Sequence, residues 1–171
     1  MERARRWLAF VPAVLWAGFI FYMSSQNATV SDGTSSGIVR DVAAAIESVT
    51  HWTALSPADP GFTTRVDLVD SIFRESMHAV EYLVFGLLVG LGVRLGQGRG
   101  WPGPGGRKRV LKTALVCFLA CVAYSLTDES HQLFVPGRAF ELLDLTLDAI
   151  GSALGVLLSL RIIRPYGRIQ P

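Results

Sequence analysis

The chain has 171 residues, of which 50% are hydrophobic and only 18% are charged. A soluble domain usually carries about 25% charged residues, so this composition disfavours a soluble globular protein and favours one that lies largely in a membrane. The formal net charge of +2 gives no indication of a nucleic-acid partner, and we expect none. Cys117 and Cys121 lie in an apolar run, where small buried side chains are expected rather than a redox or metal centre.

Four stretches of the chain are long and apolar enough to cross a bilayer, which needs about 20 helical residues. They lie at about residues 7–24, 77–95, 110–127 and 140–163. The first stretch follows a basic start, as a signal peptide does, but no small-x-small cleavage site comes after it, so we expect it to remain as a true span. The sequence therefore predicts an all-α, polytopic membrane protein with four transmembrane helices in a single domain over residues 1–171.

The basic residues predict how these helices are oriented. Twelve of the 16 lie in the N-terminal segment, in the link between the second and third spans, or at the C-terminal end, whereas 13 of the 14 acidic residues lie on the opposite side of the spans. Arginine and lysine accumulate in cytoplasmic loops. We therefore expect a multi-pass protein of the cell membrane with both termini in the cytoplasm. Segments 26–76 and 128–139 would then face outward.

The long outer segment 26–76 has an apolar pattern of its own. Apolar side chains recur at intervals of three and four at Ile38, Val42, Ile46 and Val49, which predicts an amphipathic helix over residues 35–52 that lies on the membrane surface or caps the bundle. A Ser-Pro-Ala-Asp-Pro-Gly break and a second short apolar periodicity then lead into the second span. This segment is either a lid that only seals the bundle or a lid over a lipid-side pocket.

Polar residues gather at the predicted outer ends of the spans. Asp148 lies roughly 13 Å into the fourth span at 1.5 Å per residue, where a charge costs about 2.5–3.5 kcal/mol on insertion scales. Its side chain should therefore point into the bundle and either meet a positive partner, for which His78, Arg74 and Arg138 are the candidates, or stay protonated. On the same face, Gly151 and Gly155 form a small-xxx-small step that permits close helix packing.

Several chemistries fit this cluster. Histidine and carboxylate side chains suit general acid–base catalysis, and two arginines could hold a phosphate. Two groups of side chains could bind a divalent metal ion: His78 with Glu81, and Asp128 with Glu129 and His131. Their spacing matches no specific metal-binding motif, so we expect no metal or other cofactor. The groups could also simply satisfy one another as a buried network.

The run DESHQLFVPGR at residues 128–138, followed by Asp144, Asp148 and Gly151, resembles the signature of the VanZ-like family of membrane proteins. Ser24–Ser25 after the first span and the His-x-x-x-Tyr element of the second span also resemble that family. The family is named for a protein that confers low-level resistance to the glycopeptide teicoplanin. The resemblance marks as the expected site Ser25, His78, Tyr82, Asp128, Glu129, Gln132, Arg138, Asp144 and Asp148.

These observations leave three functions open. The first is an enzyme acting on a lipid-linked or cell-envelope substrate; its catalytic candidates are His78, Asp128, Glu129, Asp144 and Asp148, and its substrate-binding candidates are Arg74, Arg138, Gln132, Tyr82 and Ser25. The second is a non-catalytic protein that binds or shields a lipid, a lipoglycopeptide or a partner protein. Ion-coupled transport through the carboxylates of the fourth span is the third, and it is disfavoured because the polar face of that span stops around Ser152.

Overall fold

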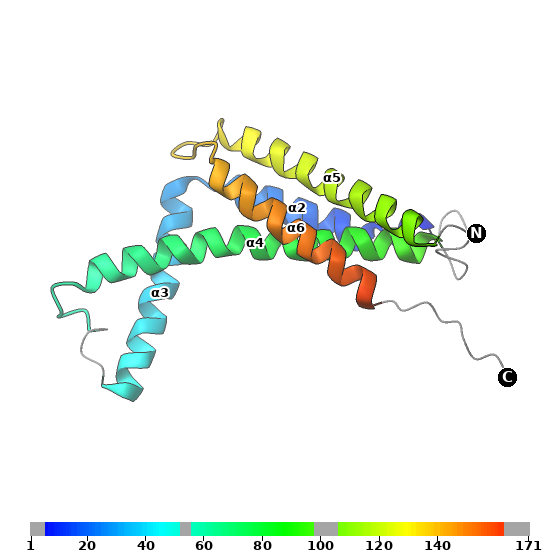
Figure 1. Ribbon diagram of the computed structural model, residues 1–171. Coiled ribbons are helices and arrows are strands. Elements are labelled where there is room, and N and C mark those ends of the chain that lie inside the picture. The colour runs from blue at the N-terminus through cyan, green and yellow to red at the C-terminus, as the bar shows by residue number, and fades with distance from the viewer. Residues whose placement is uncertain (1–5, 52–55, 98–105, 163–171) are drawn as a thin grey trace.

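The structure of the chain is a computed structural model that describes residues 6–51, 56–97 and 106–162. Within these ranges the secondary structure is helical, with turns between the helices (Figure 1). In chain order the helices are α2 (Val11–Ser24), α3 (Ala28–Thr50), α4 (Phe62–Gln97), α5 (Gly106–Gln132) and α6 (Leu142–Ile162). The predicted all-α fold is confirmed.

Four helices are long and apolar enough to cross a membrane, as predicted. The candidate spans are Arg6–Ser24, Phe62–Gln97, Gly106–Gln132 and Leu142–Ile162. The first contains a short turn before α2, where Phe10 N donates to Trp7 O at 3.0 Å. Pro12 consequently lies in the first turn of α2, where its missing N–H leaves no helical hydrogen bond unmade.

The closest packing in the bundle joins α4 to α6. Gly86 of α4 lies so near α6 that a Cβ there would come within 2.5 Å of the Ser152 carbonyl oxygen. From the other side, a Cβ at Gly151 would overlap the backbone of Ala79, and one at Gly155 the backbone of Leu83. The predicted small-xxx-small step is therefore a seam at which two backbones meet, and it holds the polar face of α6 against α4.

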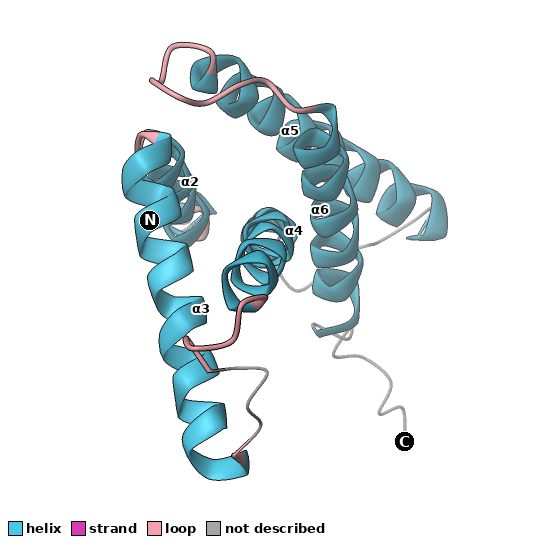
Figure 2. Ribbon diagram, turned by 90° about the vertical axis from the view of Figure 1, so that its left-hand side faces the viewer, coloured by secondary structure: helices cyan, strands magenta, loops and turns pink. Residues whose placement is uncertain are grey.

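The second span is longer than predicted, because α4 begins at Phe62 and runs without a break to Gln97. No proline or glycine interrupts residues 62–77, so the short apolar periodicity there continues directly into the span. This first part of α4 packs on α3 through Phe62 and Val66, which form a small core with Ala43. In Figure 2, α4 lies in the centre, with α2 and α3 on one side and α6 on the other.

Helix α3 begins at Ala28, seven residues earlier than predicted, and ends at Thr50. His51 follows with a φ of 54°, the left-handed conformation that commonly ends a helix. The predicted last residue, Trp52, lies outside the described ranges. The break before α4 is a turn in which Gly61 N donates to Asp59 Oδ1 at 2.8 Å and Asp59 pairs with Arg65.

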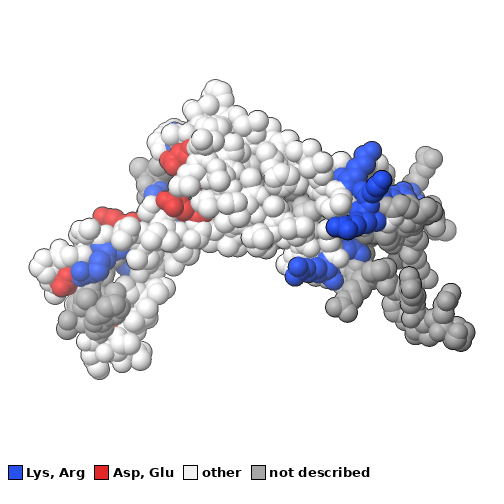
Figure 3. Space-filling model, viewed as in Figure 1, with Lys and Arg blue, Asp and Glu red and all other residues white. Residues whose placement is uncertain are grey.

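The charged side chains lie mainly toward the two ends of the molecule, with a wide uncharged surface between them, and some arginines accompany the acidic side chains (Figure 3). Arginine and lysine gather where α4 and α6 end and α5 begins, and we call this the basic end; acidic side chains gather where α5 ends and α6 begins, and we call this the acidic end. Between the two ends, large apolar side chains such as Leu15, Leu115 and Leu157 are exposed. A lipid environment would cover them.

Candidate functional site

Ionisable side chains from three helices meet inside the bundle at its acidic end. We call this set the polar cluster; it consists of His78 and Tyr82 of α4, Ser125, Asp128 and Glu129 of α5, and Asp144 and Asp148 of α6. Glu129 and Asp148 are 0% exposed and Asp128 is 4% exposed. All five predicted catalytic residues therefore lie together, although they come from positions up to 70 residues apart in the sequence.

His78 lies between two carboxylates of α6. Its Nε2 atom is 3.5 Å from Asp144 Oδ2, and its Nδ1 atom is 3.5 Å from Asp148 Oδ1. Asp144 and Asp148 are one helical turn apart, so both reach the same imidazole ring. Of the three partners considered for Asp148, the structure brings His78 to it, which agrees with the expectation that this carboxylate points into the bundle.

Ser125 holds the other oxygen of Asp148. Its Oγ donates a hydrogen bond of 2.6 Å to Asp148 Oδ2, and both side chains are buried. The sequence analysis missed this serine. It could have been found from helical spacing, because Cys121, Ser125, Asp128, Glu129 and Gln132 recur at intervals of one to four residues on one face of α5.

Glu129 is fixed at the beginning of α6. Its Oε2 atom accepts a hydrogen bond of 3.1 Å from the backbone N–H of Glu141, the residue directly before α6. Its Oε1 atom accepts a bond of 3.3 Å from Gln132 Nε2. A carboxylate at a helix N-terminus satisfies a free N–H group and interacts favourably with the helix dipole. This position gives Glu129 one defined orientation in the cluster.

Aromatic rings close the polar cluster on the side of the basic end. Tyr82 is 0% exposed, and its ring lies edge-on to Phe85 with centroids 6.1 Å apart. Phe85 in turn packs on Tyr124 at 5.1 Å, and the Tyr124 hydroxyl donates to Ala17 O at 2.6 Å. The rings therefore separate the cluster from the apolar middle of the bundle.

Several buried oxygens of this region make no hydrogen bond with the residues that the structure describes. They are Ser24 Oγ, Tyr82 Oη, Asp128 Oδ1 and Asp148 Oδ1. An unsatisfied buried polar group costs about 1–3 kcal/mol, and such groups are usually satisfied by water, an ion or a ligand. Their nearest polar neighbours are one another and other members of the cluster: Ser24 lies by Asp128, Ser125 by Tyr82, and His78 Nδ1 lies 3.5 Å from Asp148 Oδ1. These contacts are long or poorly aligned, so the cluster leaves room for water, an ion or a ligand.

The remaining predicted binding residues lie around the cluster, and they do not form one clamp. Ser25 Oγ lies 3.4 Å from His131 Nε2, and the His131 ring stacks on Phe21 with centroids 4.7 Å apart. Arg138 Nε donates to Gln26 O at 3.5 Å. Arg74, one turn before His78, lies 3.7 Å from Asp70. Both arginines would have to change partners to hold one anion together.

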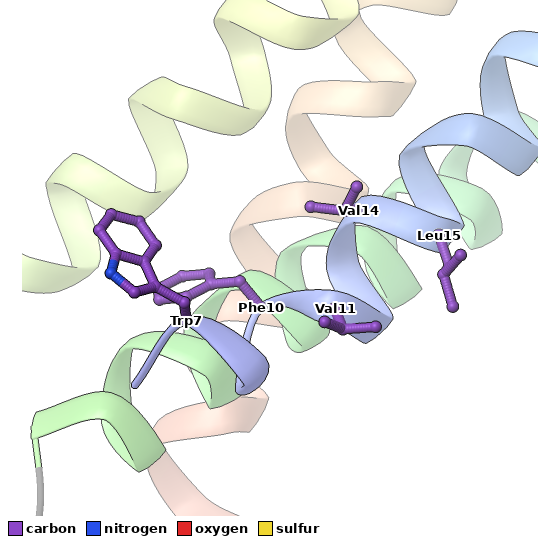
Figure 4. A pocket seen from close by; sticks show the side chains of 5 residues that line it. All are labelled: Trp7, Phe10, Val11, Val14 and Leu15. Atoms are coloured by element: carbon purple, nitrogen blue, oxygen red, sulfur yellow. The ribbon is translucent and has the colours of Figure 1, made fainter. Parts of the chain in front are cut away.

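An apolar hollow lies far from the polar cluster, near the basic end. Its lining residues are Trp7, Phe10, Val11, Val14 and Leu15 (Figure 4). These side chains offer contact area for a hydrocarbon chain. They bring no acid, base or nucleophile, so the chemistry of the protein is better sought in the polar cluster.

Four candidate spans with a buried polar cluster between them define an integral membrane protein whose ionisable groups lie inside the helix bundle. A family model described as VanZ/LLP1 matches residues 9–164, and the chain belongs to this family. The resemblance drawn from the run at residues 128–138 is thus confirmed. No curated protein and no solved structure matches the chain.

Proposed function

We propose that this protein is a membrane enzyme that acts on a lipid-linked cell-envelope substrate at the acidic end of the bundle. The observation that carries the proposal is the burial of Glu129, Asp148 and Asp128 beside His78. Ionisable groups at membrane depth are expensive, and they occur chiefly where function requires them. An acid and a base held together in one partly enclosed place are what proton-transfer chemistry needs.

The proposed roles follow from these contacts. Glu129 accepts or delivers the proton because its two oxygens are already oriented by an amide and a backbone N–H. His78 is its partner, held by the two carboxylates of α6. Arg74 lies one turn before His78 beside Asp70, and Arg138 bonds to the Gln26 carbonyl; each would leave its present partner to hold an anionic headgroup.

The loop after α5 supports a lipid-linked substrate. Leu133 and Phe134, directly after Gln132, are 59% and 84% exposed. Apolar side chains this exposed, next to a buried polar site, fit a loop that rests in the outer leaflet and contacts the hydrocarbon part of a substrate. The proposal requires the acidic end to lie outside the cell, which is the orientation that the distribution of basic residues predicts.

A comparison of envelope-lipid profiles tests this proposal. A strain that lacks the protein would be complemented with the wild type, with Glu129→Gln or with the control Glu47→Gln, which removes a carboxylate from α3, away from the cluster. We expect mass spectrometry to show the profile of the deletion strain for Glu129→Gln and the wild-type profile for the control. A wild-type profile from a membrane-inserted Glu129→Gln protein would refute the enzymatic role.

A non-catalytic function is the second candidate, and the exposed apolar row of α3 favours it. Ile38, Val42, Ile46 and Val49 are all exposed along this helix. Such a row fits a protein that binds or shields a lipid, a partner protein or a lipoglycopeptide of the teicoplanin type. Resistance to teicoplanin and binding to the protein in nanodiscs would then be lost in Val42→Asp and kept in Glu129→Gln. The opposite result would favour the enzyme.

A further inference from the structure

Three members of the polar cluster have the geometry of ligands for a metal ion. His78, Glu129 and Asp148 each offer a ligand atom, and these atoms all lie within 4.8 Å of one another. They come from α4, α5 and α6, so the meeting of the three atoms is a product of the fold. We propose that these three side chains bind a divalent metal ion of the Zn²⁺ class.

The spacing of His78 and Asp148 is compatible with an ion bound to both. Nδ1 and Oδ1 are 3.5 Å apart, and Oδ1 makes no hydrogen bond with the described residues. Two ligands at 2.0–2.1 Å from a tetrahedral Zn²⁺ lie about 3.4 Å from each other.

Each proposed ligand is also oriented by a second group. His78 presents Nδ1 to the site while its Nε2 faces Asp144 at 3.5 Å, the carboxylate–histidine arrangement that commonly supports a metal-bound imidazole. Ser125 holds the far oxygen of Asp148, and Gln132 with the Glu141 amide holds Glu129. The ligands would therefore keep their positions with little loss of conformational entropy on binding.

Buried polar oxygens beside the three ligands give further support. The Tyr82 hydroxyl and Asp128 Oδ1 are buried, lie next to Ser125 and Ser24 respectively, and are within electrostatic reach of Asp148. An ion with bound water would satisfy them, because such a water can donate to both. The two anionic ligands together match the charge of a divalent ion.

The donor set indicates which metal is expected. One imidazole nitrogen and two carboxylate oxygens suit Zn²⁺, and three protein ligands with an open fourth position are typical of catalytic rather than structural zinc. Mn²⁺ also accepts this set, so both ions are to be tested. The open position would take water or an oxygen of an anionic headgroup. With the ion bound, Glu129 and His78 would serve as its ligands, and the proton-transfer role proposed above for Glu129 would fall to Asp128, the buried carboxylate of the cluster that is not a ligand.

Metal binding by the full chain in nanodiscs, with any purification tag removed, tests the proposal. After treatment with a chelator, the protein would be titrated with Zn²⁺ and with Mn²⁺, and its metal content measured by mass spectrometry. We expect one ion per chain in the wild type and at least a tenfold weaker affinity in His78→Asn and Asp148→Asn. The matched controls His51→Asn and Asp67→Asn replace exposed side chains and should bind as the wild type does.

Co²⁺ absorption spectra of the wild type keep the test decisive if a cluster variant fails to fold. Tetrahedral coordination should give intense visible bands that excess Zn²⁺ removes. A wild-type chain that takes up neither Zn²⁺ nor Mn²⁺ and gives no such bands would overturn the proposal, as would folded ligand variants that bind with unchanged affinity. Metal content is measured without a substrate, so its outcome is separate from that of the envelope-lipid experiment.

Discussion

Replacement of Gly155 by alanine should separate α4 from α6. A Cβ at this position would overlap the Leu83 carbonyl oxygen and come within 2.6 Å of the Leu87 nitrogen. Real Cβ atoms essentially never lie closer than 3.0 Å to such neighbours. Both neighbours are backbone atoms, so neither can rotate away, and the helices must move apart. Such overpacking destabilises a protein by about 1–3 kcal/mol. We expect the upper value of about 3 kcal/mol here, because the clashing atoms belong to the backbone and no side-chain rotation can relieve the overlap.

The better helix propensity of alanine offsets about 1 kcal/mol of this cost. The net loss of about 2 kcal/mol corresponds to roughly a 30-fold larger unfolding equilibrium constant. Denaturant titration of the detergent-solubilised protein, followed by tryptophan fluorescence, would measure it. Gly18→Ala is the matched control, because a Cβ at Gly18 meets nothing within 4 Å, and its stability should stay equal to or rise above that of the wild type. Equal stabilities of the two variants would refute the reasoning.

Three further changes test individual contacts. Ser125→Ala removes the donor to buried Asp148 and should lower the free energy of unfolding by about 1–3 kcal/mol; an unchanged denaturation midpoint would contradict this contact. Arg94→Met removes hydrogen bonds to the last carbonyls of α6 and should speed hydrogen exchange in the final turn of α6, whereas unaltered exchange would show that the arginine is dispensable there. The hydrogen bond from Arg65 holds the pKa of Asp59 below its usual range, so the stabilisation of this turn is present above the usual pKa of aspartate and is lost as the pH falls through the lower folded-state pKa. Amide exchange across residues 59–65 should rise in that acidic range, and exchange that does not respond to pH would contradict the assignment.

Much of the fold follows from hydrophobicity alone. Apolar runs of the right length predicted all four spans, because a lipid environment requires a helix wherever the chain crosses it. The length of α4 was not predicted, since residues 62–76 are too polar to be assigned to a span. Their helix forms because Phe62 and Val66 pack on α3, a tertiary contact that a hydropathy pattern does not contain.

The candidate site was predicted in part. The depth of Asp148 required that it point inward, and the structure gives it His78 and Ser125 as partners. Helical periodicity places side chains on a face, but it does not tell which faces of different helices meet. For that reason the sequence could not show that Glu129 joins His78 and Asp148, or that Arg74 and Arg138 bind different groups.

The position of the polar cluster on the extracytoplasmic side is the claim on which the proposed function depends, and cysteine labelling in intact cells tests it directly. Phe134→Cys would place a thiol in the exposed loop after α5, and Lys108→Cys would place one at the basic end; the native Cys117 and Cys121 are buried and give the background. A membrane-impermeant maleimide should label Phe134→Cys in intact cells and Lys108→Cys only after permeabilisation. Labelling of Lys108→Cys in intact cells, with Phe134→Cys protected, would contradict the proposed orientation and the extracytoplasmic site built on it.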